Sequence, residues 1–213
     1  MGPLDLGLSA LGGALKRLQV RHFPAFFALL LSGCVQQAVL ENDVRSAQWK
    51  ARTLSTAADP ALAHAALSAQ LVELEALHQR DPDDARVLGL LERGYRLMAH
   101  GFVELRYMEA LGAGELAIAE RERQLRADAE ARARYYRQRL GAAAAASAPL
   151  AVESDFAEPE AACARHDRAA YELRLNALLA AAETQPEERL ERTLSRRLAA
   201  SWLSANVAAR CKF

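Results

Sequence analysis

The sequence predicts an all-α protein, and three observations point to this class. No run of residues alternates apolar and polar side chains in the way a half-buried β-strand does. Alanine and leucine dominate, whereas isoleucine, which favours strands, occurs once, at Ile118. Apolar residues instead recur at steps of three and four over several long stretches, which is the spacing of one helical face. We therefore expect about five or six helices.

The composition is that of an ordinary globular protein. The chain has 213 residues, of which 52% are hydrophobic and 25% are charged, enough for one domain with a substantial core. Lysine and arginine total 27, and aspartate and glutamate also total 27. Because these charges cancel, there is no general electrostatic basis for binding nucleic acid, and we expect no nucleic-acid partner.

The clearest helical pattern runs from Asp59 to Leu111 and predicts two antiparallel helices. Pro60 stands at the first helical position behind the Asp59 cap, and Pro82 ends the first helix. Neither helix can bury its apolar stripe alone, so further helices must pack around the pair. The two stripes consist of Leu67, Leu71, Leu74 and His78 in the first helix and of Leu88, Leu91, Tyr95, Met98, Phe102 and Leu105 in the second.

Residues 36–56 and 115–140 extend the helical pattern on either side of this hairpin. The first stretch carries Trp49 among smaller apolar residues, and the second is rich in alanine, arginine and glutamate. Charges of both signs are mixed and cancel in the second stretch. This mixture predicts a solvated face with ion pairs four residues apart rather than a binding patch. We expect one helical domain over residues 34–140.

The remaining residues predict a linker followed by a second hairpin. Residues 141–160 are rich in small side chains, and Pro149 and Pro159 argue against a continuous helix there. Residues 161–213 again show apolar residues at helical spacing, with a turn near Gln185. We expect a C-terminal helical hairpin over 161–213.

The first 33 residues have the order of charged and apolar residues found in an export signal. Lys16, Arg17 and Arg21 precede an apolar run at 23–31. That run is roughly half the length that spans a bilayer, so a signal peptide over 1–33 is favoured over a retained transmembrane helix. An apolar N-terminal helix packed on the body is a further alternative.

The signal ends in a lipidation motif. Leu31-Ser32-Gly33-Cys34 resembles the lipobox of bacterial lipoproteins, in which small residues admit the signal peptidase and the cysteine is acylated. We expect lipidation at Cys34 and a lipid-anchored protein on the periplasmic face of a bacterial membrane. Val35, instead of the aspartate that retains lipoproteins in the inner membrane of enteric bacteria, favours the outer membrane.

The two other cysteines predict a disulfide. With Cys34 acylated, Cys163 and Cys211 are the remaining thiols of an exported chain, in a compartment that favours pairing. Cys163 lies 22 residues before Gln185 and Cys211 lies 26 residues after it. In a hairpin that turns at Gln185, the two positions differ by about 6 Å along the helices, which a frayed end can absorb. The alternative is two buried free cysteines.

Several short motifs occur in the order seen in one transporter family. After the lipobox come Asp59-Pro60, Leu74-Glu75, Asp81-Pro82-Asp83, Gly94-Tyr95 and Phe102-Val103-Glu104, followed by an arginine-rich helix with the sequence RYYRQRL at 134–140. In this order and spacing, residues 31–140 resemble the T component of tripartite ATP-independent periplasmic (TRAP) transporters. The C-terminal third departs from the pattern, because family members are expected to continue with further helix pairs.

The resemblance implies a lipoprotein built from tetratricopeptide-like antiparallel helix pairs. It also implies association with the periplasmic substrate-binding protein of the transporter, and a cavity for a hydrophobic ligand. The resemblance leaves open whether the chain forms a homo-oligomer. The candidate residues for binding the partner or ligand, on the second helix of the central hairpin, are Arg93, Tyr95, Arg96, His100, Phe102, Glu104, Arg106 and Tyr107.

No motif predicts an enzyme. The sequence contains no Ser-His-Asp order, glycine-rich phosphate loop or Cys-x-x-Cys motif, and we expect no catalytic residues and no cofactor. His100 and Glu104 could bind a metal only with a third ligand from another helix, so a simple polar pair is favoured and we expect no metal site. The alternatives to partner binding are a structural or envelope-maintenance lipoprotein, and a hydrolase whose residues the sequence does not single out.

Overall fold

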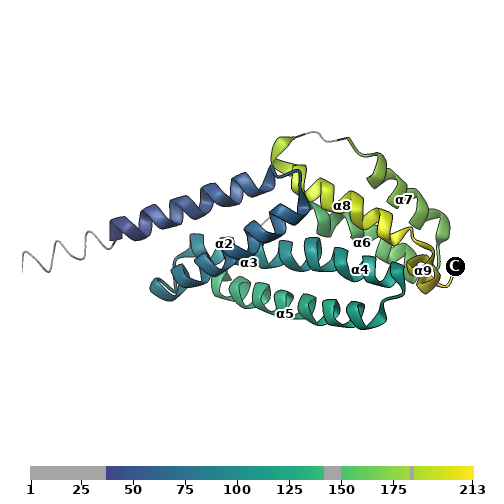
Figure 1. Cartoon of the computed structure of the whole chain (residues 1–213), viewed down its shortest axis with the longest axis horizontal. Helices are drawn as coiled ribbons and strands as arrows, with labels where there is room; N and C mark the ends of the chain where they lie inside the picture. Colours follow the sequence, from purple (N-terminus) through teal and green to yellow (C-terminus); the bar gives the residue numbers. More distant parts are fainter. Residues whose placement is uncertain (1–36, 142–149, 183–184) are drawn as a thin grey trace, which may run out of the picture. The chain divides into compact units, whose positions relative to one another are not determined.

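The computed structural model of this protein describes residues 37–141, 150–182 and 185–213 (Figure 1). The chain divides into two compact units, residues 1–43 and 44–213. Of the first unit, only residues 37–43 are described, and they are helical. The expected signal peptide and the lipidation site Cys34 lie outside the described residues. All contacts reported below are within residues 44–213.

The all-α prediction is confirmed, since the described residues contain helices and no strand. Residues 37–55 form one helix. The expected number of five or six helices is too low, because α2 to α9 alone are eight. The elements are α2 (Pro60–Arg80), α3 (Ala85–Arg96), the π-helical η1 (Leu97–Val103), α4 (Glu104–Ala113), α5 (Leu116–Leu140), α6 (Ala151–Ala164), α7 (Arg168–Ala180), the 3-10 helix η3 (Pro186–Glu188), α8 (Arg189–Trp202), α9 (Ala205–Ala208) and the 3-10 helix η4 (Ala209–Cys211).

The central hairpin forms as the sequence predicts. Asp59 caps α2 by accepting a hydrogen bond from the Ala61 backbone N–H at 2.8 Å. Asp84 caps α3 in the same way, accepting from the Arg86 N–H at 2.8 Å. These caps satisfy backbone donors that the first turn of a helix leaves without intrahelical partners.

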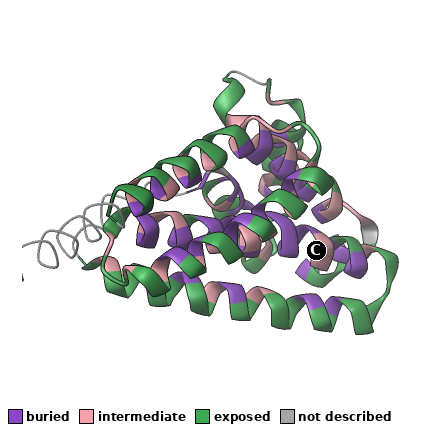
Figure 2. Ribbon diagram, turned by 60° about the vertical axis from the view of Figure 1, so that its left-hand side comes forward, coloured by how far each residue is buried: buried purple, intermediate pink, exposed green. Residues whose placement is uncertain are grey.

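The second helix of the hairpin is the centre of the bundle. Residues 85–113 form one continuous helix that consists of α3, η1 and α4, and α2, α5, α6 and α8 pack around it. Within η1 the backbone N–H of Glu104 bonds to the Ala99 carbonyl, the five-residue step of a π-helix. Leu91, Phe102 and Leu105 are all buried. Figure 2 shows buried residues gathered on the inward sides of the helices and exposed residues on their outward sides.

Helix α5 packs closely along this central helix. Gly114 ends α4 in the left-handed conformation, with φ +79°, which lets the chain turn back directly into α5. The buried face of α5 is formed mainly by Ala119, Ala129, Ala133 and Tyr136, and such small side chains allow the two backbones to approach each other. The larger apolar residues of α5 at positions 118 and 125 are exposed.

The charged residues of α5 are paired differently from the prediction. Pairs within the helix were expected, and some exist, but four charged side chains of α5 reach other helices and a fifth, Arg139, reaches the turn between α2 and α3. The alanine face causes this difference, because it brings neighbouring helices within the reach of long side chains. These ion pairs are Arg106–Glu122, Glu104–Arg126, Glu75–Arg132, Glu92–Arg137 and Asp83–Arg139.

The linker expected over 141–160 is wrong for its second half, because Ala151–Ala164 forms α6 with Pro159 inside the helix. An internal proline costs a helix about 3 kcal/mol. Burial of Val152 and Phe156 against the C-terminal helices offsets this cost. The Glu153 carboxylate accepts from the Leu150 N–H at 3.2 Å and so caps the first turn. Residues 142–149 lie outside the described residues.

The C-terminal hairpin expected over 161–213 is divided further than predicted. Its first arm breaks between α6 and α7, where His166 has a φ of 58° and Asp167 caps α7. Helices α7 and α8 form the actual hairpin, and the Tyr171 hydroxyl donates to the Trp202 carbonyl at 2.5 Å.

The disulfide between Cys163 and Cys211 is confirmed, with a Cα–Cα distance of 4.9 Å. It joins the last turn of α6 to η4, not two arms of one simple hairpin as the sequence argument assumed. The His166 ring nitrogen Nδ1 lies 2.6 Å from the Cys211 carbonyl oxygen and adds a polar contact at the same junction. The C-terminal segment is therefore attached to the bundle covalently.

Gly101→Ala is expected to lower the free energy of unfolding by about 1–2 kcal/mol. A Cβ at Gly101 would lie 2.9 Å from Cδ1 of Leu194, which is fully buried and cannot move without displacing its neighbours. Gly89→Ala is the matched control, because a Cβ there meets nothing within 4 Å. It should raise stability by about 0.5–1 kcal/mol through helix propensity. Urea unfolding measures both, and equal effects would contradict the close packing at Gly101.

Cys211→Ser is expected to lower the free energy of unfolding by about 4 kcal/mol, the chain-entropy estimate for a bridge across 48 residues. Unfolding of the wild type with and without reductant should show the same difference. Reductant should have no effect on the variant. If the wild type melts identically in both conditions, the bridge does not stabilise the fold.

Candidate functional site

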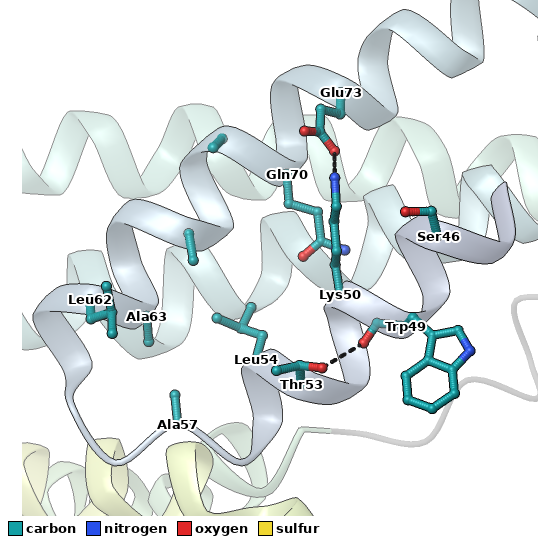
Figure 3. Close-up of a pocket in the computed structure, with 12 residues that line it drawn as sticks. Ser46, Trp49, Lys50, Thr53, Leu54, Ala57, Leu62, Ala63, Gln70 and Glu73 are labelled. Atoms are coloured by element: carbon teal, nitrogen blue, oxygen red, sulfur yellow. Dashed lines mark hydrogen bonds and ion pairs between the residues drawn. The ribbon is translucent and has the colours of Figure 1, made fainter. Parts of the chain in front are cut away.

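An apolar groove lies between α2 and the preceding helix (Figure 3). It has a volume of about 520 Å³. One wall comes from residues 46–57 and the other from the side of α2 that does not contact α3. The residues that line it are Ser46, Trp49, Lys50, Thr53, Leu54, Ala57, Leu62, Ala63, Ala66, Ala69, Gln70 and Glu73.

The groove is largely apolar, and most of its polar side chains are paired. The Lys50 ammonium reaches across to Glu73 at 2.6 Å, as Figure 3 shows. The Gln70 amide donates to the Ala47 carbonyl at 2.9 Å, and the Thr53 hydroxyl donates to the Trp49 carbonyl at 3.1 Å. The rest of the lining consists of alanine, leucine and tryptophan side chains and of Ser46.

Two large apolar side chains stand at the groove without burial. Trp49 is 68% exposed and Leu62 is 66% exposed. An exposed tryptophan beside an apolar depression is unusual on a soluble surface and is typical of binding sites. The arrangement can hold an apolar group by burial.

Sequence reasoning did not find this groove, although α2 contains a signal for it. The predicted stripe of α2 is its inner face, and Leu67, Leu71 and Leu74 are buried as expected. The opposite face is also apolar, with Leu62 and Val72 among alanines. A helix that is apolar on both faces indicates a second contact surface.

The residues predicted to bind a partner do not lie on one surface. Arg96 and Glu104 are buried, Arg96 in ion pairs with Glu92 and Glu153, and Glu104 in one with Arg126. Burial raises the pKa of the Glu104 carboxyl, and the Arg126 guanidinium opposes that shift. These side chains hold the bundle together and are not accessible to a partner in this structure.

Phe102 is buried in the core as well, beside the ring of His64 at 5.3 Å between centroids. Arg106 is half-buried and lies 3.0 Å from Nε2 of His64. Burial and the nearby arginine cation both lower the pKa of His64. The Arg106 guanidinium also pairs with Glu122 at 2.9 Å, so it joins α4 to two neighbouring helices.

Arg93, His100 and Tyr107 keep exposed surface, but on different sides of the central helix. Arg93 pairs with Glu191 of α8 at 2.7 Å, and His100 lies 3.5 Å from the Glu153 carboxylate of α6. That these residues bind a partner stays a prediction. Other helices of the same chain pack around the central helix, so these residues do not form one common surface.

A polar junction joins α2, α3 and α5 at Glu75. Its carboxylate accepts from the hydroxyls of Tyr95 at 2.7 Å and Tyr136 at 2.5 Å, and from Arg132 at 2.9 Å. Burial opposes ionisation of Glu75, but these hydrogen bonds and the arginine charge together hold its pKa below the ordinary value. Burial and the bond to Glu75 raise the pKa of Tyr95 to about 12 and that of Tyr136 further.

This junction brings together residues from three of the motifs that carry the family resemblance. Glu75, Tyr95 and Tyr136 come from helices far apart in sequence, and all three contact one another. Arg139, from the same motif as Tyr136, pairs with Asp83 at 2.7 Å. In this structure the motif residues fix the packing of the three helices.

The described part of the chain was also searched for a metal-binding cluster and for a membrane-spanning helix. Within residues 37–141, 150–182 and 185–213, no three His, Cys, Asp or Glu side chains are placed together to hold a metal ion. Nor does any helix in these ranges combine the length and the apolar character that crossing a bilayer requires.

Comparison of the chain with protein-family models, with curated proteins and with solved structures finds no match.

Tyr136→Phe is expected to lower the free energy of unfolding by about 1.5–2 kcal/mol near neutral pH, because it removes a hydrogen bond to the charged Glu75. Tyr135→Phe is the control, since that neighbouring residue is exposed and its hydroxyl accepts a bond from the exposed Arg139 at 3.2 Å. It should change stability by less than about 0.5 kcal/mol.

The effect of Tyr136→Phe should depend on pH in a defined direction. The folded-state pKa of Glu75 is lower than its ordinary value of 4.5, so ionised Glu75 stabilises the fold above that value. This stabilisation is lost as the pH falls through the folded-state pKa. The difference between wild type and Tyr136→Phe should therefore shrink below about pH 4. A difference that is constant from pH 7 to pH 3 would contradict this account.

Proposed function

We propose that the protein is a non-catalytic, lipid-anchored helical binding protein of the periplasm, whose groove between α2 and residues 46–57 holds an apolar ligand. We further propose that it works with the substrate-binding protein of a TRAP-type transporter. The observation that carries the proposal is the groove itself, which is open, apolar and bordered by an exposed tryptophan.

The size and construction of the groove support a ligand site. Its volume of about 520 Å³ falls within the range of roughly 300–1,000 Å³ that small-molecule sites occupy. Both walls are helices whose backbone groups are bonded within the helix, so the site is preformed. Small residues such as Ala63, Ala66 and Ala69 leave the space, and a chain or ring of carbon atoms would bury the alanine and leucine surface.

The resemblance to the T component supplies the choice of partner. Helix α2 packs against α3, and α5 packs along the continuous helix of α3, η1 and α4. We propose that these antiparallel contacts are of the tetratricopeptide-like kind. The residues that carry the resemblance meet at Glu75, so the matched motifs belong to one packed unit. A lipid on Cys34 would hold this unit at a membrane surface facing the periplasm, where substrate-binding proteins diffuse.

The groove proposal is tested with an apolar fluorescent probe and the intrinsic fluorescence of Trp49. The other tryptophan, Trp202, is buried away from the groove, so probe binding should quench Trp49 and the quenching should disappear in Trp49→Phe. Ala57→Phe fills the groove and should weaken binding at least tenfold. Ala177→Phe makes the same change on an exposed position of α7 and should leave binding unchanged.

The partner proposal has a separate readout. The purified substrate-binding protein of a TRAP transporter from the same organism should be retained by immobilised wild-type protein and not by an unrelated lipoprotein. Probe binding without retention would favour the alternative, a lipoprotein without a transporter link. If the probe binds wild type and Ala57→Phe equally, the groove is not the ligand site.

A further inference from the structure

The disulfide between Cys163 and Cys211 lies at the surface, and its two halves are unequally buried. Cys211 is 4% exposed, whereas Cys163, in the last turn of α6, is half-buried. Residues 164–169, which directly follow Cys163, are all exposed. Because access to the sulfur atom limits the rate of thiol–disulfide exchange, a thiol from solvent should attack Cys163 rather than Cys211.

The backbone beside both cysteines is in an unfavourable conformation. Within the described ranges, His166 and Lys212 are the two residues other than glycine with positive φ, at 58° and 54°. Such residues are uncommon and cluster at sites where the surrounding structure holds strain. His166 lies three residues after Cys163, and Lys212 directly follows Cys211. Both strained residues are therefore at the junction that the disulfide closes, and opening the bridge lets the backbone there relax.

Three cations surround the bridge. Arg165 lies two residues after the first cysteine, Arg210 and Lys212 flank the second, and the two cysteine Cα atoms are 4.9 Å apart. All three side chains are exposed, and none of them forms an ion pair within the described part of the chain. The carboxylate of Asp167, in the same turn, already accepts a hydrogen bond from the Ala170 backbone N–H at 3.0 Å as the cap of α7. Positive charge at the junction attracts an attacking thiolate and stabilises the thiolate that leaves.

We propose that this bridge is an activated thiol–disulfide exchange site of the folded protein, reduced by a dithiol that attacks Sγ of Cys163. The inference goes beyond the proposed function and does not depend on it. It is compatible with the stabilisation expected from the bridge. Exchange at an accessible sulfur is a property of the native state, whereas the chain-entropy effect of a bridge acts on the unfolded state.

The exchange proceeds in two steps that conserve atoms and electrons. One thiolate of the dithiol attacks Sγ of Cys163, the bond between the two cysteines breaks, and its electron pair leaves with the Cys211 sulfur, which takes up a proton. The second thiol of the dithiol then loses its proton and attacks its own neighbouring sulfur in the mixed disulfide, which releases the Cys163 thiolate to be protonated. The dithiol is oxidised to a disulfide, and two electrons and two protons pass to the two cysteines.

The fold can separate the two sulfur atoms without unfolding. The Asn206 side chain donates to the Gly112 carbonyl at 2.7 Å, and Nδ1 of His166 lies 2.6 Å from the Cys211 carbonyl oxygen. These contacts hold the segment that carries Cys211, and both involve exposed side chains. A small movement of residues 209–213 parts the sulfur atoms and leaves the buried leucines of α7 and α8 in place.

The experiment uses the full-length chain with Cys34→Ser, whose only cysteines are those of the bridge. Dithiothreitol is added under native conditions, and the released thiols are alkylated with a maleimide and counted by mass. The rate of reduction should rise in proportion to dithiothreitol and should not change when urea is added below the unfolding transition. A rate that rises steeply with urea and levels off at the unfolding rate would show that only the unfolded chain is reduced, and it would overturn the proposal.

The point of attack is mapped with a monothiol. Brief exposure to glutathione, followed by a maleimide and peptide mapping, should place glutathione on Cys163 and the maleimide on Cys211 at least fivefold more often than the reverse. An equal distribution, or glutathione mainly on Cys211, would contradict the assignment of Cys163 as the sulfur that is attacked.

Arg165→Gln tests the role of the cations. The glutathione thiolate is anionic, so removing this charge should slow its attack at least threefold at low ionic strength, and the difference should shrink at about 1 M salt. Arg52→Gln removes an exposed arginine from the helix of residues 37–55 and is the matched control, which should react like the parent chain. If Arg165→Gln also reacts like the parent chain, the junction is not activated and the bridge is an ordinary structural one.

Reduced thioredoxin distinguishes the two sources of a dithiol. Native-state reduction by it that is faster than by dithiothreitol, at equal dithiol concentration, supports a protein as the reductant. Slower reduction supports a small dithiol. Probe binding in the groove is measured separately, so it can fail or succeed independently of the exchange.

Discussion

The fold depends on neutralising charges that the central helix carries into the interior. Glu92 is 1% exposed, and Arg96 and Glu104 are also buried, so each requires an opposite charge from a neighbouring element. Helix α5 supplies Arg137 and Arg126, and α6 supplies Glu153. Such pairs add little net stability, but a buried charge that loses its partner costs about 3–5 kcal/mol. They therefore restrict α5 and α6 to one register along the central helix.

This constraint explains why α5 has an alanine face. Long arginine and glutamate side chains can cross between helices only where the backbones are close. The stripe of Ala119, Ala129 and Ala133 provides that proximity, and larger apolar residues such as Ile118 remain outside. The bundle thus combines ion pairs at close range towards α5 with leucine and aromatic packing among α6, α7 and α8.

Local signals in the sequence were enough to predict part of this structure. The hairpin of α2 and α3 was predictable because Asp59, Pro60 and Asp84 act through the backbone next to them. The helix α6 was not, since Pro159 is a local signal against it and the burial of Phe156 against distant helices overrides that signal. The disulfide was predicted correctly from the number of cysteines and from the oxidising compartment expected for an exported chain. The break at His166 changes the hairpin geometry that the prediction assumed.

The candidate binding residues do not lie on one surface, for a similar reason. Arg96 and Glu104 are charged residues that one expects at a surface, but in the fold they are buried and pair with Glu153 and Arg126, which lie 57 and 22 residues away in sequence. The groove could have been found from the sequence. Residues of α2 on the side opposite its leucine stripe are almost all apolar, and a search for one stripe per helix overlooks the second.

The π-helical segment η1 has a consequence for how this sequence tolerates length changes. One extra residue in a helical turn rotates everything after it by about 100° relative to an uninterrupted α-helix. The extra residue therefore sets the rotation of α4 relative to α3. With it, Arg96 before η1 faces Glu153, and Glu104 after η1 faces Arg126. Deleting a single residue between Leu97 and Val103 would leave a good helix with α4 turned away from α5. The length of this segment is as strict a requirement of the bundle as the identity of its buried side chains.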